Sequence, residues 1–300
     1  MRCSHPFRAL LAVLLALSLA PALAGAAEPM AVKPSQLDPQ VREFDDNHLV
    51  IPAERPGAPL VVFMPGTGGK PENVIRLLKV IAEQGYAVIG LEYPDVPAVA
   101  QRCPRDPDHN CSADFRRMRL YGEGPSKMVS NTAADSIQGR LTLLLRRLAL
   151  EQPKAGWDRY LKGGAPDWTR IVVSGHSQGS GMAAYLAKQT PVARVVLFSS
   201  PWDFTQPGEV IDPWLSGPSA TPPERWYGAY NSREATAGAL ARAYKALAIP
   251  PDHIRVFTLD LPPAMARAKS DNPYHSAGLR DPRYEDQWRF LYGKASEIAP

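Results

Sequence analysis

The chain has 300 residues, and its 45% share of hydrophobic residues supports a large core and excludes a disordered or fibrous protein. With 34 Lys and Arg against 30 Asp and Glu, the net charge is only +4, which argues against a dedicated nucleic-acid-binding protein. The 31 prolines are about twice the usual share and indicate long ordered loops, where functional sites are often built.

The first 26 residues have the pattern of a secretory signal peptide. Arg2 and Arg8 supply a positively charged segment before an apolar run over residues 10–19, which is too short to span a bilayer comfortably. Small residues follow and offer A-x-A cleavage sites at 22–24 and 24–26. We therefore predict a signal peptide over 1–26, no stable membrane anchor, and a mature protein that is periplasmic or extracellular.

The remaining residues, 27–300, predict a single domain in which strands and helices alternate. Short apolar runs predict strands over 59–64, 86–92, 170–174, 193–198, 225–230 and 254–259. Helical periodicity predicts helices over 71–84, 131–150, 179–188, 235–248 and 281–291. Fully apolar strands alternating with helices predict an α/β fold whose mostly parallel sheet has helices on both faces.

Residues 201–225 are unusual because they carry six prolines and two tryptophans. This composition predicts an ordered insertion over the carboxyl-terminal edge of the sheet, and an ordinary long connection is the alternative.

Two cysteines remain once the predicted signal peptide is removed. Cys103 and Cys111 lie in a polar stretch, and an even pair in an exported protein predicts a disulfide that closes a surface loop. No second ligand pair matches zinc spacing, so we predict no metal site. The basic run that follows, Arg116, Arg117 and Arg119, predicts a solvated face, with contact to an anionic substrate or cell-envelope polymer as the alternative.

The most informative motif is Gly175-His176-Ser177-Gln178-Gly179, which directly follows an apolar strand and opens a helix rich in small residues. A nucleophilic serine needs a very sharp strand-to-helix turn, and glycines on either side remove side chains that would clash there. The helix N-terminus also presents amide groups to an oxyanion. The motif therefore predicts that Ser177 is a catalytic nucleophile.

On this motif, the chain from about Leu60 to Leu291 resembles the α/β-hydrolase superfamily. The resemblance implies a sheet of about eight strands, the chain order serine, acid, histidine, and a second oxyanion donor in the loop over residues 65–69. By position, the amide of Thr67 would pair with that of Gln178, and Gly68 remains an alternative to Thr67.

The general base follows by elimination among six histidines. His5 lies in the predicted signal peptide, His48 precedes the core strands, and His109 lies in the loop between the cysteines. His176 is inside the serine motif itself, and His253 opens a strand rather than following one. Only His275 lies after the last predicted strand and before the last helix, so we predict that it takes the hydroxyl proton and later protonates the leaving group.

The acid is less constrained. In the superfamily it usually follows the strand before the penultimate helix, and the resemblance therefore implies Glu234, at the exit of the strand predicted over 225–230. Asp203 is the next candidate and Asp260 the third.

These residues predict an exported serine hydrolase that cleaves a small-molecule or polymeric ester through an acyl-enzyme, with no metal or organic cofactor. An exported serine peptidase, amidase or acyltransferase is the alternative among enzymes. The alternative from another class is a hydrolase-fold protein that binds a ligand and turns nothing over.

Overall fold

The computed structural model describes residues 28–41, 43–205, 210–267 and 272–298. The predicted signal peptide lies outside these ranges, so export stays a prediction. Within them, no helix has both the length and the apolar character that crossing a membrane requires.

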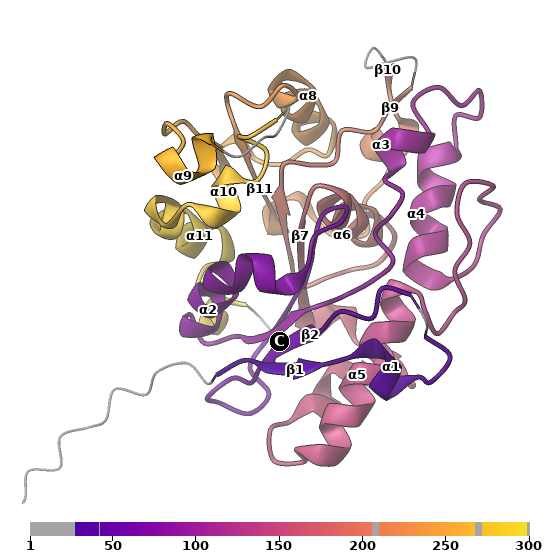
Figure 1. Ribbon diagram of the computed structural model, residues 1–300, viewed down its shortest axis with the longest axis vertical. Helices are drawn as coiled ribbons and strands as arrows, with labels where there is room; N and C mark the ends of the chain where they lie inside the picture. Colours follow the sequence, from indigo (N-terminus) through magenta and orange to yellow (C-terminus); the bar gives the residue numbers. More distant parts are fainter. Residues whose placement is uncertain (1–27, 42, 206–209, 268–271, 299–300) are drawn as a thin grey trace, which may run out of the picture.

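Eight strands form the central sheet, in the order β1-β2-β4-β3-β7-β8-β11-β12 (Figure 1). The last six strands in this order run parallel, whereas β2 pairs antiparallel with β4, and β1 antiparallel with β2. The strands are β1 Met30–Val32, β2 His48–Ile51, β3 Leu60–Met64, β4 Ala87–Gly90, β7 Ile171–His176, β8 Arg194–Phe198, β11 Trp226–Asn231 and β12 Ile254–Phe257. This mostly parallel sheet confirms the predicted fold class.

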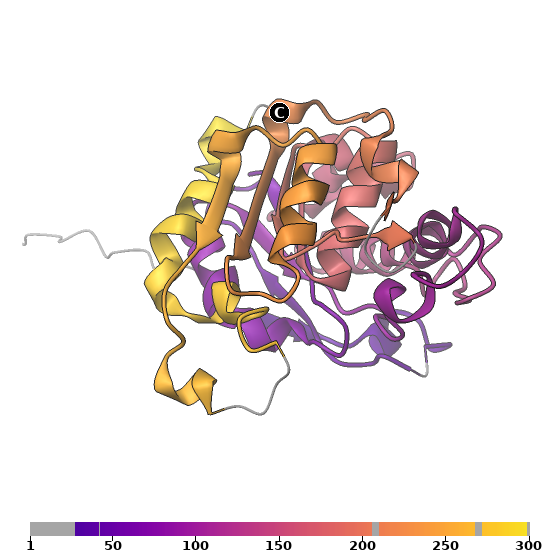
Figure 2. The same cartoon turned by 90° about the horizontal axis from the view of Figure 1, so that it is seen from above.

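Helices cover both faces of the sheet. Figures 1 and 2 show α2 and α11 on one side and α4, α5 and α6 on the other. The longer helices are α2 Ile75–Glu83, α4 Cys111–Tyr121, α5 Ile137–Glu151, α6 Gln178–Gln189, α8 Ala237–Ala246 and α11 Glu285–Tyr292. Short helices of four residues are α1 Pro34–Leu37, α3 Val99–Arg102, α7 Pro213–Ser216, α9 Pro263–Ala266 and α10 Ala277–Arg280.

The apolar strands pack on both faces, as their sequences predict. Along β3, Leu60, Val62 and Met64 join the buried cluster that includes the helices α5 and α6. The alternate residues Val61 and Phe63 join the cluster on the side of α2 and α11. A strand with two buried faces needs apolar residues at every position, and this explains the continuous apolar runs.

Several elements differ from the sequence predictions. The helix predicted over 131–150 begins at Ile137, because Ser136 is its N-cap and accepts a hydrogen bond from the Gly139 amide at 3.0 Å. Helix α4 and the antiparallel strands β1 and β2 were not predicted. The predicted solvated basic face is wrong for two of its residues, since Arg116 and Arg119, on α4, are only 1% and 4% exposed.

The predicted disulfide is present. Cys103, directly after α3, is bonded to Cys111, the first residue of α4, with the two Cα atoms 5.5 Å apart. It ties two helices together at the ends of the loop between them.

The segment 201–225 contains a small hairpin and a short helix. Strands β9 (Phe204–Thr205) and β10 (Val210–Ile211) pair antiparallel, and α7 follows. Figure 1 shows the hairpin between α3 and α8, and side chains of Phe204 and Thr205 line a cavity with residues of both helices. One further short hairpin joins β5 (Leu161–Lys162) to β6 (Ala165–Pro166).

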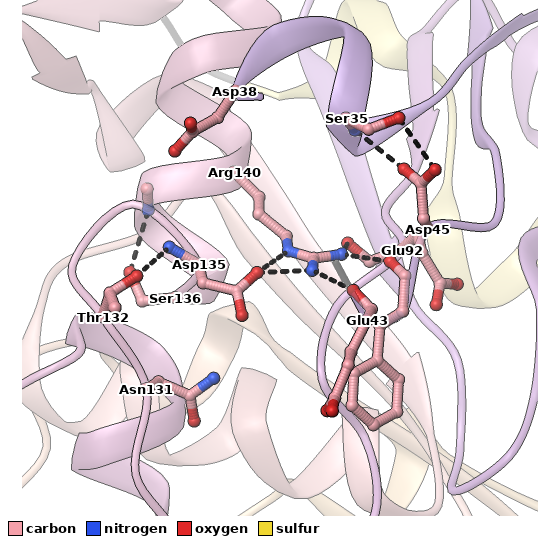
Figure 3. A network of polar contacts seen from close by, with 12 residues as sticks. Ser35, Asp38, Glu43, Asp45, Glu92, Asn131, Thr132, Asp135, Ser136 and Arg140 are labelled. Carbon is pink, nitrogen blue, oxygen red and sulfur yellow. Dashed lines mark hydrogen bonds and ion pairs between the residues drawn. The ribbon is translucent and has the colours of Figure 1, made fainter. Parts of the chain in front are cut away.

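A buried arginine fixes the chain that leaves β4 (Figure 3). The Arg140 guanidinium, 1% exposed, donates to the carboxylate of Asp135 at 2.8 Å and to the carbonyl oxygens of Glu43 and Glu92 at 3.1 and 3.3 Å. Planar guanidinium groups suit such multiple contacts. The network therefore anchors the segment after β4, which continues toward the site described next.

Candidate active site

The Ser177 backbone has the strained geometry that an exposed nucleophile requires. It lies between β7 and α6 with φ 51° and ψ −119°, a left-handed conformation rarely adopted by a residue with a side chain. Such a conformation costs about 1–3 kcal/mol and persists only where the surroundings impose it. Its amide donates to the Phe198 carbonyl at 3.0 Å, which ties the turn to the adjacent strand β8.

The two glycines of the motif are required by close backbone contacts. A Cβ atom on Gly175 would lie 2.5 Å from the carbonyl carbon of Gly179, and one on Gly179 would lie 2.1 Å from the Met64 carbonyl oxygen. Both distances are far below van der Waals contact. The motif spacing therefore follows from the packing of the turn against the end of β3.

His275 contacts the buried carboxylate of Glu234. The Nδ1 atom of His275 lies 2.8 Å from Oε2 of Glu234, whose side chain is completely buried. The other carboxylate oxygen accepts hydrogen bonds from the Ser199 hydroxyl at 2.6 Å and the Asn231 amide at 2.8 Å. These donors suit an ionised carboxylate, which places the imidazole proton on Nδ1 and leaves Nε2 free to accept one.

Ser177 and His275 line one cleft of about 360 Å³ together with the loop over residues 66–69. Among the described residues the Ser177 hydroxyl has no hydrogen-bond partner. In unliganded enzymes, catalytic hydrogen bonds are often loose and tighten only when substrate binds. The cleft is also lined by Asn272 and Arg280, which the sequence analysis did not single out.

His176 has a role that its place inside the motif did not reveal. Its Nε2 lies 2.9 Å from the carbonyl oxygen of His275, and the two rings lie 4.6 Å apart. Burial lowers the pKa of His176 to about 3, so the ring is neutral at ordinary pH. Because a carbonyl oxygen only accepts, Nε2 must carry the proton, and His176 holds the backbone of His275 in place.

The loop after β3 lies directly against Ser177. A Cβ on Gly66 would lie 3.0 Å from Cβ of Ser177. Burial raises the pKa of the buried Asp95 carboxylate to about 6, and its interactions with the backbone amides of Gly68 and Gly69 oppose that rise. The Gly69 amide also donates to the Gly66 carbonyl at 2.8 Å. Because its amide interacts with Asp95, Gly68 is a weaker candidate than Thr67 for the oxyanion donor.

Two amides remain available where the oxyanion is expected. The Thr67 amide has no hydrogen-bond partner within the described part of the chain, and Thr67 lines the cleft. Gln178 is the first residue of α6, where backbone amides lack partners inside the helix. The Gln178 side chain is fixed by the Val99 amide, which donates to its Oε1 at 3.1 Å. The Tyr93 hydroxyl donates a hydrogen bond to the Pro65 carbonyl oxygen at 2.9 Å and so helps to fix the start of the loop over residues 65–69.

The two alternative acids are engaged elsewhere. Asp203 forms a buried, bidentate pair with Arg116 at 2.6 and 2.7 Å, and it accepts a hydrogen bond from the Trp214 indole at 3.0 Å. Asp260 is exposed and pairs with Arg233. Of the three candidate carboxylates, the structure places only Glu234 against His275.

No protein-family model matches the chain, and the curated proteins contain no significant match. The sheet order, with its antiparallel first strands, and the serine turn between β7 and α6 are those of a known architecture. The fold is that of the α/β-hydrolases.

Solved structures with a similar fold include a hormone-sensitive lipase from a metagenome library, with 14% identity, a TM-score of 0.49, and coverage of 92% of this chain and 87% of that one. An S-formylglutathione hydrolase from Agrobacterium tumefaciens has 12% identity and a TM-score of 0.46, covering 84% and 90%. The protein TT1662 from Thermus thermophilus has 15% identity and a TM-score of 0.42, covering 87% and 98%. Such distant likenesses carry no information on substrate, so the function rests on the geometry of the site.

Proposed function

We propose that the protein is an exported serine hydrolase that cleaves carboxylic esters through an acyl-enzyme on Ser177. The observation that carries this proposal is the contact between the buried Glu234 carboxylate and His275, which lines the same cleft as a serine held in a strained turn. This arrangement has the three roles that serine hydrolysis needs, namely nucleophile, base and orienting acid.

In the proposed reaction, Nε2 of His275 takes the proton from the Ser177 hydroxyl while Oγ attacks the ester carbonyl carbon. The Thr67 and Gln178 amides hold the resulting oxyanion. Collapse breaks the bond to the alcohol, and His275 gives the proton to the departing oxygen. A water molecule then repeats the attack on the acyl-enzyme, and the acid product and free Ser177 are released.

Glu234 acts through His275. Its buried negative charge stabilises the imidazolium that forms in both steps and keeps the neutral ring in the tautomer that accepts the serine proton. The proposal of export is supported by the Cys103–Cys111 disulfide, because disulfides persist mainly in oxidising compartments.

A fluorophosphonate probe tests the proposal. We expect it to label the wild type on Ser177 and to leave Ser177→Ala unlabelled, and we expect the wild type to hydrolyse p-nitrophenyl acetate. If the folded wild type, checked by circular dichroism, is neither labelled nor active on esters, the hydrolase proposal is wrong and a binding function replaces it. Matched anilide substrates separate ester from amide hydrolysis in the same assay.

A further inference from the structure

A second cavity lies beside the catalytic residues and is distinct from the catalytic cleft. It has a volume of about 340 Å³ and lies between the disulfide-tied helices α3 and α4, the segment 202–205, and the first turn of α8. Binding sites for small molecules are commonly cavities of about 300–1,000 Å³ lined mainly by apolar groups. The size and the walls of this cavity fit that description.

The cavity adjoins the catalytic residues at three points. Trp202 lines it, and the Trp202 ring lies 6.0 Å from the ring of His275. Ala235, the residue directly after Glu234, is a second lining residue. Val99, a third, donates its amide to the side chain of Gln178, whose own amide is the proposed oxyanion donor. A group attached to an ester bound at Ser177 therefore has the cavity next to it.

Two threonines that line the cavity have hydroxyl groups without partners. The Oγ1 atoms of Thr205 and Thr236 are buried, and neither has a hydrogen-bond partner in the described structure. Buried polar groups in native proteins are nearly always satisfied, and an exception calls for an explanation. A bound group with a hydrogen-bonding oxygen supplies one.

The charges around the cavity select against anions. Asp203 lines the cavity, whereas Arg116, with which it forms an ion pair, does not. Asp212 is also in the wall, where it accepts a hydrogen bond from the Ser112 hydroxyl, and burial raises its pKa to about 6. Among the residues that the structure describes, no lysine or arginine lines the cavity. Carboxylates without a free cation disfavour a negatively charged ligand.

From these observations we infer that the cavity binds an uncharged, largely apolar group of the ester substrate, which carries a hydrogen-bonding oxygen. This inference rests on the proposed hydrolase function. At about 30 Å³ for each water-sized group, 340 Å³ accommodates about eleven non-hydrogen atoms, the size of a medium-length chain or an aromatic ring system. The group belongs to the acyl or the alcohol side of the ester.

The test fills the cavity and measures selectivity. Ala239, on α8, lines the cavity, and Ala239→Phe places a large side chain in it. Ala241→Phe is the matched control, because Ala241 lies on the same helix, is exposed, and is not a lining residue. The acyl arm compares kcat/KM for p-nitrophenyl octanoate and acetate, and the alcohol arm compares octyl acetate with ethyl acetate.

We expect Ala239→Phe to lower the long-to-short ratio by at least about tenfold in one arm, which identifies the side of the ester, while Ala241→Phe keeps the wild-type ratio in both. Unchanged ratios in both arms for folded Ala239→Phe overturn the inference.

A measurement without turnover separates this inference from the hydrolase proposal. Calorimetry on Ser177→Ala is expected to detect n-octanol, to detect octanoate anion at least about tenfold more weakly, and to detect neither once Ala239→Phe is added. Equal or tighter binding of the anion contradicts the charge argument. If n-octanol binds in this way but the wild type hydrolyses no ester, the proposed function fails, and the cavity is not a substrate site.

Discussion

Glu234→Gln is the most informative single change, because it alters charge while keeping the side-chain size. Glutamine retains an oxygen that accepts from Ser199 and Asn231, so the local fold is expected to survive. Its amide group, however, faces Nδ1 of His275 across 2.8 Å. Two N–H groups cannot face each other, so the imidazole changes tautomer and Nε2 no longer accepts the serine proton. We expect kcat to fall by about 10⁴, or about 5.5 kcal/mol of transition-state stabilisation.

Asp203→Asn and Asp260→Asn are the matched controls. Asp203 neutralises the buried guanidinium of Arg116, so its loss is expected to lower the free energy of unfolding by about 3–5 kcal/mol, with a far smaller effect on kcat than Glu234→Gln. Asp260 forms an exposed pair, and its replacement is expected to change neither stability nor rate appreciably.

Initial rates with p-nitrophenyl acetate and thermal melts followed by circular dichroism measure both quantities for each variant. The assignment is wrong if Glu234→Gln stays within about tenfold of the wild-type kcat, or if folded Asp203→Asn suffers the larger loss.

Three further predictions concern the surroundings of the site. Asp95→Asn is expected to lower kcat on p-nitrophenyl acetate by about tenfold to a hundredfold with little change in KM, because a neutral side chain interacts more weakly with the amides of Gly68 and Gly69 and the loop over residues 65–69 loosens. An unchanged kcat refutes this role. The double variant Cys103→Ser, Cys111→Ser is expected to unfold about 2.5 kcal/mol more easily in urea, and reduced wild type should match it; equal stability of oxidised and reduced protein speaks against this estimate. Burial raises the pKa of Glu92 to about 8, above its unfolded value, so its contribution to stability is full below about pH 4.5 and is lost as pH rises through 8. Glu92→Gln is therefore expected to raise the melting temperature at pH 8.5 relative to wild type and to leave it nearly unchanged at pH 4. A higher melting temperature only at low pH would contradict the raised pKa of Glu92.

The central strands and the serine turn could be predicted because their sequences carry strong local constraints. A parallel strand buried on both faces needs an apolar run, and the turn at Ser177 tolerates only glycine at positions 175 and 179. The disulfide could be predicted from the even pair of cysteines in a chain with an export signal.

Elements that depend on distant partners could not be predicted. Helix α4 carries arginines that look solvated in sequence, but Arg116 is buried against Asp203, 87 residues away. Strands β1 and β2 have only 3 and 4 residues, which is too short for a clear pattern, and they pair antiparallel at one side of the sheet. Asp95 follows β4, whereas the loop whose amides it interacts with follows β3, so their contact depends on the folded sheet. A carboxylate shortly after a parallel strand could nevertheless have indicated a residue near the site.

Some residues of the candidate site could also be predicted from the sequence, and others could not. Elimination among the histidines led to His275, because chain order alone sets it apart. Sequence left three carboxylates open, since strand exits do not reveal which acid an imidazole will meet. The contact between Glu234 and His275 spans 41 residues and follows only from the folded sheet.

The most direct test of the account is to trap the covalent intermediate. The wild type is mixed with p-nitrophenyl butyrate, quenched in acid within the first turnover, digested and analysed by mass spectrometry. The account predicts one butyryl group on the peptide that contains Ser177, and its absence from Ser177→Ala. Turnover of the ester with the butyryl group on a different residue, or with no acylated peptide and no burst of p-nitrophenol, would contradict it.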